Sequence, residues 1–422
     1  MKPKLPSRDK NRDLFREELI DILDMSHNLC VTADLLDWSL FREAFDKEFP
    51  SKTGRPATPS RLIAGLLYLK ALYNLSDKQL VRTWVENPYW QYFCGEQYFQ
   101  HKFPLNSSVL SKWRKRIGAE GMERLLLGML DVAKREGLLD KRELLRVNID
   151  TTVQEKYVRH PLDSQLYYRS RCQLVDLAAK YFIPLRQSYR FKAKEALFRA
   201  QGYGHAKQYR RMHKQVKVLK NYLGRVCRDI ERYCANTAFS AEDLMQALCH
   251  ANRLLSQQKR DKNKLYSLHA PEVECISKGK ARKRYEFGVK VSFVTTSKQG
   301  WVLAAKALHG NPYDGHTLSE SIDAAINNTG VMPEYGFVDR GYRGHSETRL
   351  QVFMSGQRRG VTKSVKRWLK RRSAIEPVIG HMKHSHGLAT NRLKGKVGDQ
   401  INALSAAIGY NFALLLNKLS PT

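Results

Sequence analysis

The sequence has no long hydrophobic run, and no stretch reaches the roughly 18 consecutive apolar residues that a membrane-spanning helix needs. Its N-terminal segment also lacks the apolar core of a secretory signal peptide. No G-x-x-x-x-G-K-[ST] motif occurs, so a nucleotide-binding P-loop is not indicated. We therefore do not expect a membrane or secreted protein, and we predict a cytoplasmic location.

Cysteine is scarce, with 7 in 422 residues, and no two form a C-x-x-C pair. An odd number of unclustered cysteines provides neither a disulfide framework nor a zinc-finger ladder. This pattern fits a reducing compartment. The seven are Cys30, Cys94, Cys172, Cys227, Cys234, Cys249 and Cys275.

Negative charge is also in short supply, since 41 Asp and Glu face 73 Lys and Arg, for a net charge of +32. Such an excess predicts an acidic partner, with nucleic acid as the first choice and an acidic membrane surface as the second. The positive charge is spread along the chain, as expected for grooves that follow phosphates. The exceptions are residues 1–50, with a net charge of −3, and residues 301–350, which are slightly acidic between the two most basic stretches.

The length of the chain suggests two to three domains, and residues 1–140 are predicted to form an all-helical region. Within it, residues 108–117 read as a short helix with an apolar side and a basic side. Two predicted helices precede it, which favours DNA binding of the helix-turn-helix kind, although a solvated basic face would look the same. The cations expected to contact DNA are Lys112, Lys115 and Arg116.

Strands are predicted at 144–150, 285–295, 301–308 and 335–339, where apolar residues alternate between turn signals. Residues 166–265 instead predict a helical insertion, with one helix near 173–186 and a heptad seam from Met212 to Tyr233. The insertion is expected to contact DNA, to mediate dimerisation, or to expose a solvated charged face. Its outer cations are Lys207, Arg210, Arg211, Lys214, Lys217 and Lys220.

Three carboxylates stand at the ends or starts of predicted elements. Asp150 and Asp339 end strands, and Glu376 begins a helix. Phosphodiester chemistry with two Mg²⁺ ions needs such hard oxygen ligands on a rigid base. Each carboxylate also has a structural alternative: Asp150 could cap a turn, Asp339 could pair with Arg340 or Arg343, and Glu376 could belong to a capping box with Ser373. Considered together, the three predict a metal site.

Other polar residues near these positions are weaker candidates. Asp314 lies in a turn-rich loop after a predicted hairpin. Asp314 and Asp163 are candidates for residues that position the metal ligands without binding the metal themselves. His381, His384 and His386 have helical spacing, but no fourth ligand for zinc is evident.

Three segments resemble bacterial insertion-sequence transposases of the D-D-E class, most closely the insertion-sequence-five family. They are residues 147–153 (VNIDTTV), 338–345 (VDRGYRGH) and 372–383 (RSAIEPVIGHMK). Residues 54–60 (GRPATPS) and the predicted helices after them resemble the DNA-binding region of that family. The resemblance implies an α/β (α+β) fold: an RNase H-like mixed sheet flanked by helices in residues 141–165 and 266–422, with residues 166–265 inserted after its first strand.

The same resemblance implies a bacterial, nucleoid-associated DNA transposase. It would cleave the terminal inverted repeats of its own element with Mg²⁺, for which Mn²⁺ can substitute, and transfer the freed 3′-OH ends into target DNA. Its partners would be double-stranded DNA and further copies of itself, as a homodimer or a larger synaptic assembly. The alternatives are a catalytically silent DNA-binding regulator of the same descent and an RNase H-like nuclease.

The family pattern also assigns roles to single residues. Asp150, Asp339 and Glu376 would be the metal-binding catalytic triad. The related pattern Tyr-x2-Arg-x3-Glu-x6-Lys is matched by Arg372, Glu376 and Lys383, whereas Leu369 stands where the tyrosine would be. That departure puts a hairpin intermediate in doubt. Arg372 and Lys383, together with Arg340 and Arg343, would contact DNA.

Overall fold

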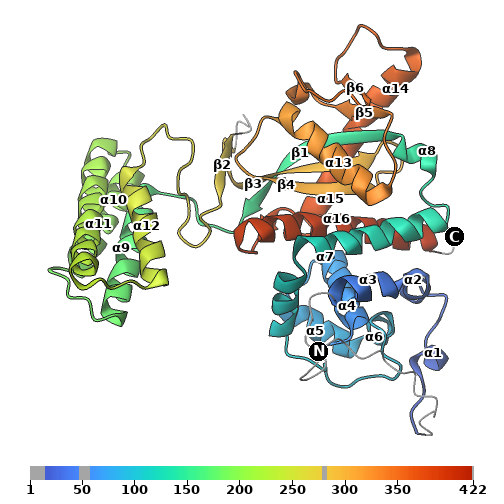
Figure 1. Cartoon of the computed structure of the whole chain (residues 1–422), viewed down its shortest axis with the longest axis horizontal. Helices are drawn as coiled ribbons and strands as arrows, with labels where there is room; N and C mark the ends of the chain where they lie inside the picture. The colour runs from blue at the N-terminus through green and yellow to red at the C-terminus, as the bar shows by residue number, and fades with distance from the viewer. Residues whose placement is uncertain (1–14, 47–57, 278–282, 421–422) are drawn as a thin grey trace. The chain divides into compact units, whose positions relative to one another are not determined.

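The computed structural model describes residues 15–46, 58–277 and 283–420 (Figure 1). The chain forms two compact units, each considered separately below. The core unit comprises Met1–Glu155 and Val289–Thr422, and the inserted unit comprises Lys156–Gly288. Of the segment 54–60, which resembles a DNA-binding region, residues 54–57 lie outside the described residues.

Helices make up the described N-terminal part of the core unit. The nearly all-apolar helix α4 is buried among them, and α5 begins with a capping box between Ser76 and Gln79. The helix predicted at 108–117 forms the first part of α7, and Gly118 breaks the helical geometry directly after it, with φ 61°. The helices are α1 (Leu19–Ile22), α2 (Asn28–Leu35), α3 (Trp38–Asp46), α4 (Ser60–Tyr73), α5 (Asp77–Glu86), α6 (Pro88–Phe93), α7 (Ser108–Arg135) and α8 (Lys141–Leu144).

A mixed sheet forms the centre of the core unit, so the chain has a mixed α/β fold. Its strands lie in the order β4–β3–β1–β5–β6, and the short β7 also pairs with β1. The pairs β1–β5 and β5–β6 are parallel, and β3–β4 is antiparallel. The strands are β1 (Arg146–Lys156), β3 (Tyr285–Thr296), β4 (Val302–Leu308), β5 (Tyr335–Val338), β6 (Gln351–Met354) and β7 (Thr390–Asn391).

Each of the four predicted strands overlaps an observed strand. The strand predicted from Leu144 begins at Arg146, because Lys141–Leu144 forms the short helix α8. Sequence patterns did not indicate β6, whose four residues are too few to show alternation.

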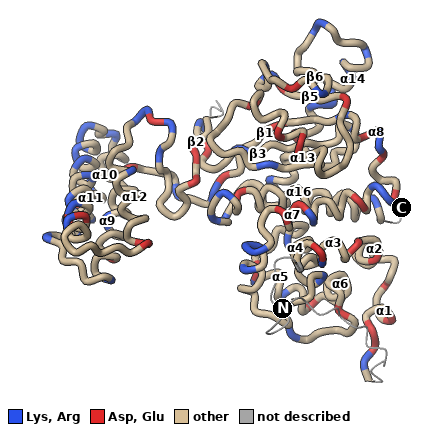
Figure 2. Tube along the Cα trace, viewed as in Figure 1, with Lys and Arg blue, Asp and Glu red and all other residues tan. Residues whose placement is uncertain are grey.

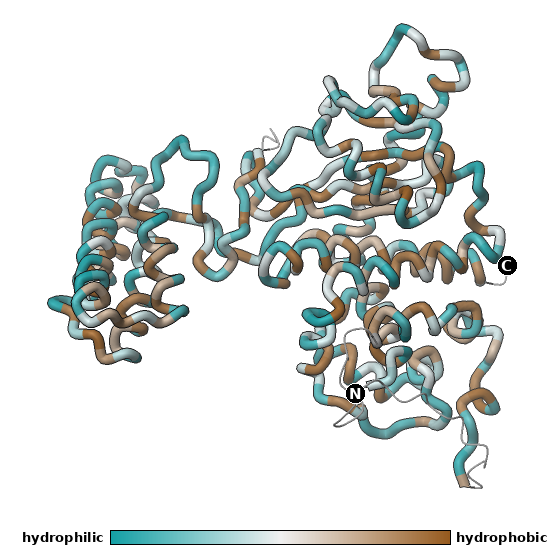
Figure 3. The backbone as a smooth tube through the Cα atoms, viewed as in Figure 1, coloured by the Kyte–Doolittle hydropathy of each residue, from teal (hydrophilic) through white to brown (hydrophobic). Residues whose placement is uncertain are grey.

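The C-terminal helix α16 (Gly395–Leu419) joins the sheet to the N-terminal helices by packing against β4, α4 and α7. Figure 3 shows hydrophobic stretches in the sheet and along α16, and one continuous hydrophobic core runs through these elements. The remaining helices are α13 (Leu318–Thr329), α14 (Lys363–Arg371) and α15 (Ile375–Ser385), with the 3-10 turns η1 (Asp314–Thr317), η2 (Arg340–Tyr342) and η3 (Arg372–Ala374). No helix in the described part of the chain is both long and apolar enough to cross a membrane.

The inserted unit has its own hydrophobic core, built by four helices. The predicted seam is confirmed on α11, where Leu219, Leu223, Val226 and Ile230 are buried. The helix predicted at 173–186 is wrong in position, because α9 ends at Lys180 and Phe182 adopts a left-handed φ of 55° shortly before Pro184. The elements are α9 (Asp163–Lys180), α10 (Arg190–His205), α11 (Tyr209–Thr237), α12 (Glu242–Ser256) and β2 (Glu274–Ser277), which pairs antiparallel with the first residues of β3.

Candidate active site

Asp150 and Asp339 lie level with one another on neighbouring parallel strands. Asn148 of β1 is the register partner of Phe337 of β5, and each aspartate follows two residues later. Adjacent strands are about 4.8 Å apart, and side chains two residues apart share a face. Asp339 comes directly after β5 and caps the turn η2, because its side chain accepts a hydrogen bond of 2.9 Å from the Gly341 amide. The strand pairing therefore directs both carboxylates to one place.

A buried tyrosine marks the centre of this place. Tyr342, the last residue of η2, is fully buried. Its burial raises the pKa of its hydroxyl well above the ordinary value, and the negative charges of Asp150, Asp314 and Asp339 raise it further. The three carboxylates thus all lie within electrostatic reach of one phenol, which stays protonated at neutral pH.

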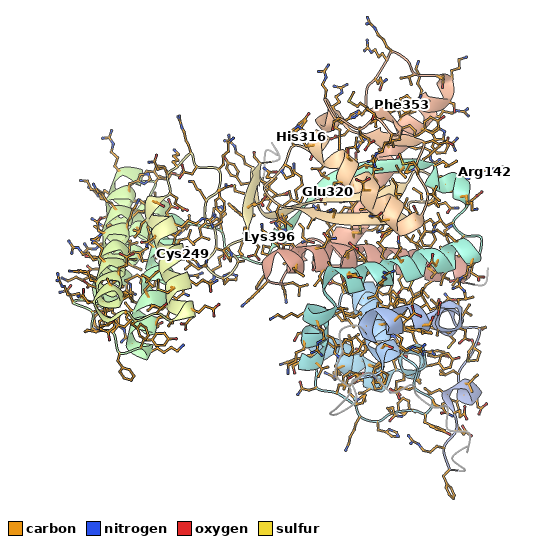
Figure 4. All side chains as sticks on the ribbon, viewed as in Figure 1. Arg142, Cys249, His316, Glu320, Phe353 and Lys396 are labelled. Carbon is orange, nitrogen blue, oxygen red and sulfur yellow. The ribbon has the colours of Figure 1, made fainter. Side chains whose placement is uncertain are left out.

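Asp314 joins the pair from the turn η1, which follows β4. Its Oδ1 accepts hydrogen bonds of 3.0 Å from the Thr151 hydroxyl and 3.0 Å from the Lys290 ammonium. Thr151 is the neighbour of Asp150, so one hydrogen bond connects η1 to β1. In Figure 4 the labelled His316 marks this turn. The structure therefore places Asp314, predicted as a supporting group, beside the two strand-end aspartates.

Gly341 allows two of these carboxylates to come close to the backbone. A Cβ atom at this position would lie 3.0 Å from Oδ1 of Asp339 and 3.2 Å from Oδ2 of Asp314. Any side chain at position 341 would therefore push the carboxylates away from their positions.

Arg372 connects Glu376 to this group. Its Nη2 lies 2.9 Å from Oε1 of Glu376 and its Nη1 lies 3.5 Å from Oδ2 of Asp150. The arginine side chain is only 13% exposed, whereas that of Glu376 is 61% exposed. The capping-box alternative for Glu376 is not observed, because the Ser373 hydroxyl donates to the Lys370 carbonyl and α15 has no side-chain cap.

The break before Glu376 has a local cause in the sequence. The basic run before it is helical, as α14, and ends at Arg371. Pro377 cannot donate to a helix continuing from α14, so a 3-10 turn separates α14 from α15. This turn places Arg372 and Glu376 one helical turn apart, with Glu376 near the N-terminus of α15.

The donor set suits a hard cation, because carboxylate oxygens are the ligands that Mg²⁺ prefers. As the side chains now stand, the guanidinium of Arg372 provides the positive charge between Asp150 and Glu376. Within the described ranges, no three His, Cys, Asp or Glu side chains are arranged to hold a metal ion. Binding a cation here would require the Arg372 side chain to turn away from Asp150 and Glu376.

The other residues predicted to bind DNA lie at several places on the core unit. Lys112, Lys115 and Arg116 are exposed on α7, opposite the buried Leu110, Trp113 and Ile117. Arg340 and Arg343 are exposed beside Asp339, and the Nε of Arg340 donates to the Ser355 carbonyl.

Lys383 lies seven residues beyond Glu376 on α15, about 10 Å along the helix axis. There it lines a cleft of about 610 Å³ together with Lys70, Asp77, Arg114 and Arg392. The structure thus brings Arg372 to Asp150, and it places Lys383 on a separate basic cleft of the core unit.

The weaker candidates lie apart from each other. Asp163 belongs to the inserted unit, where it is exposed in the first turn of α9. His381 and His384 are exposed, whereas His386 is buried with its Nδ1 3.3 Å from the Ala71 carbonyl. Burial lowers the pKa of His386. The three histidines therefore do not converge.

Sequence reasoning missed three residues of the site: Tyr342, Lys290 and Thr151. Tyr342 and Thr151 lie inside the segments that carried the resemblance, so their proximity to Asp339 and Asp150 was the available signal. Lys290 had no such signal, because it lies in the middle of a strand otherwise rich in buried residues.

Comparisons with known proteins found a family domain in the N-terminal part of the chain and an uncharacterized relative. The family described as Transposase domain (DUF772) matches residues 17–116, which extend from α1 into the first half of α7. An uncharacterized protein, ORF8 in the nfe locus of Rhizobium meliloti, is 47% identical over 209 residues, which are all of that protein and 50% of this chain. No solved structure matches the chain.

Proposed function

The chain belongs to the same family as the ORF8 protein of the Rhizobium meliloti nfe locus and is related to transposases through residues 17–116; from this premise we propose that it is a DNA transposase of the D-D-E class. Its substrates would be the terminal inverted repeats of its own element and a target DNA. The insertion-sequence-five family and an RNase H-like core are part of the proposal. The mixed sheet supports an RNase H-like core, because its first strand is central, carries Asp150 and precedes a helical insertion.

One observation carries the proposal: the parallel register of β1 and β5 sets Asp150 and Asp339 side by side. Glu376 reaches Asp150 through Arg372. Carboxylates cost free energy when crowded together, so a protein keeps such a cluster where a cation compensates the negative charge.

In the proposed mechanism, a water molecule attacks the phosphodiester at the element end and releases a 3′-hydroxyl. This hydroxyl then attacks a phosphate of the target DNA and displaces the 3′-oxygen of the target strand. Asp150, Asp339 and Glu376 would hold Mg²⁺, which when bound would supply activation of the attacking oxygen and positive charge for the leaving one. Lys290 and Thr151 hold Asp314 in position beside Asp339. Arg372, released from its carboxylates, binds a phosphate of the DNA end, with Arg340 and Arg343 binding phosphates nearby.

The test is nicking of a plasmid that carries the coding region with its native flanks. The unmodified protein is compared with Asp339→Asn, with Mg²⁺ and with chelator. Glu334→Gln is the matched control, because Glu334 is exposed just before β5 and its backbone amide, not its side chain, bonds to Leu145. We expect Mg²⁺-dependent breaks at two defined ends, which Asp339→Asn abolishes and Glu334→Gln leaves intact. Cutting at scattered positions would indicate a general nuclease.

A silent DNA-binding regulator is the second candidate, favoured by the ion pairs of Arg372 with Asp150 and Glu376. Such pairs neutralise the carboxylates without any metal. The same assay decides between the two functions: a regulator binds the flanks, and neither the unmodified protein nor Asp339→Asn cuts them, even when both element ends are supplied.

A further inference from the structure

The inserted unit contains a long stretch of strongly one-sided charge. Residues 186–228 contain 13 Lys and Arg and a single carboxylate, Glu195. About a tenth of the chain thus contributes a net charge of +12 to the total of +32. Figure 2 shows this concentration as blue segments along α10 and α11.

Much of this charge forms a straight stripe on α11. Arg210, Lys214, Lys217, Arg225 and Arg228 recur at helical spacing with Asn221 among them, and we call these five cations the α11 stripe. Since successive helical residues rotate by about 100°, the stripe points away from the apolar seam. All five are exposed, whereas Leu219, Leu223 and Val226 of the seam are buried.

The first half of the α11 stripe carries uncompensated charge. Among the described residues, no carboxylate pairs with Arg210, Lys214 or Lys217. Farther along the helix, Asp229 pairs with Arg186 and Arg232. Helical surfaces of soluble proteins ordinarily alternate charges of both signs, because like charges at this spacing repel each other. An unpaired stripe is therefore maintained at a cost in stability.

The shape of the stripe determines which polyanion it fits. It extends about 27 Å at 1.5 Å per residue, the length of roughly eight base pairs of duplex DNA at 3.4 Å each. A membrane surface fits poorly, because an interfacial helix inserts its apolar face, and the apolar face of α11 is packed in the core of its own unit. We propose that the α11 stripe binds the phosphate backbone of double-stranded DNA without reading its sequence.

The choice of DNA over another polyanion rests on the proposed function. The stripe is a row of positive charges, which suits the repeated phosphates of a backbone, so we expect it to add affinity and not specificity. The inserted unit would then hold DNA outside the recognised element ends, whether flanking or target sequence.

The experiment measures binding of the full chain, in EDTA, to a labelled random-sequence duplex about 30 base pairs long, over a range of about 0.05 to 0.3 M NaCl. The test variant is Arg210→Gln/Lys214→Gln/Lys217→Gln. The matched control is Lys259→Gln/Arg260→Gln/Lys262→Gln, which removes the same charge from exposed positions of the same unit. Circular dichroism checks that both variants fold.

Each phosphate contact contributes about 0.9 to the slope of log affinity against log salt. We expect the test variant to lower that slope by roughly 2 to 3 and to weaken binding at least about tenfold near 0.1 M salt. The control should change both much less. Equal effects of the two variants would overturn the proposal, because general charge alone would then explain binding.

Two further results distinguish DNA binding by the stripe from protein docking and from the transposase proposal. If the test variant binds DNA normally but changes the mass of the particle in light scattering, the stripe is a protein-docking face and the inference is wrong. If neither the unmodified protein nor any variant cuts DNA, but the test variant binds the duplex more weakly than the control variant does, the stripe inference stands and the transposase proposal fails. Loss of cutting by Asp339→Asn, together with selective loss of duplex binding by the test variant, supports both.

Discussion

The candidate site of the core unit and the α11 stripe of the inserted unit differ in how their positive charges are paired. At the candidate site, two cations are paired with carboxylates: Arg372 with Asp150 and Glu376, and Lys290 with Asp314. In the inserted unit, the first cations of the α11 stripe have no described carboxylate partner. A paired charge fixes atoms in place, as chemistry at one phosphate requires. An unpaired, exposed stripe suits a long polyanion, which supplies the missing charge itself.

The largest effect on stability should come from breaking a pair in the core unit. Arg114 is nearly buried and makes two hydrogen bonds to Asp77, of 2.8 Å and 2.6 Å. Asp77→Ala would leave this guanidinium without its partner, and we expect it to lower the free energy of unfolding by about 3 kcal/mol. Denaturant unfolding measures this loss.

The matched control for that change is Asp323→Ala. Asp323 pairs with Arg349 at the surface, where the two side chains are 51% and 45% exposed. Its loss should cost no more than about 1 kcal/mol. Similar losses in the two variants would contradict the idea that the core unit depends on its buried pairs.

The next largest expected effect is a loss of DNA cleavage caused by a substitution that leaves the charge unchanged. Gly341→Ala inserts a methyl group against the carboxylates of Asp339 and Asp314. Because small displacements of reacting groups are costly, we expect cleavage of element ends to slow by about tenfold or more. Gly380→Ala is the control, since no atom lies within 4 Å of its added Cβ. Equal rates for both variants would show that the carboxylates need no exact placement.

Paired charge in the core unit should also make stability depend on pH. Hydrogen bonds from the Arg349 side chain lower the pKa of Glu347 to about 2, from an ordinary 4.5. The stabilisation is therefore complete above the unfolded value of 4.5 and is lost as the pH falls toward 2. Glu347→Gln should cost about 1–2 kcal/mol at neutral pH. Melting temperatures against pH should converge with those of the unmodified protein near pH 2.

The smallest expected effect is the change in stability when the α11 stripe is neutralised. Neutralising Arg210, Lys214 and Lys217 removes no ion pair and relieves repulsion, so the free energy of unfolding should stay within about 0.5 kcal/mol of the unmodified value. Denaturant unfolding under the conditions of the Asp77 experiment measures it. A loss comparable to that of Asp77→Ala would mean that the stripe stabilises its own unit and is not reserved for a partner.

Local patterns were sufficient for most of the elements. The alternation of apolar residues predicted the strands with Asp150 and Asp339, and the heptad seam predicted α11. Both patterns repeat over a few residues, so a short segment of sequence is enough to show them. The end of α9 was misplaced, since Phe182 adopts a left-handed backbone that its residue type rarely takes. The strand β6 was missed because its pairing partner, β5, is what defines it.

For the site, the sequence alone determined which groups exist: three carboxylates at element ends, and an arginine one helical turn before Glu376. The tertiary structure decided which of them meet. The parallel register levels Asp150 with Asp339, the turn after β4 brings Asp314 to Lys290 and Thr151, and Lys383 is carried to a separate cleft. Apart from the contact of Lys290 with Asp314, such meetings depend on strand pairing and packing between residues more than a hundred positions apart, which no local pattern encodes.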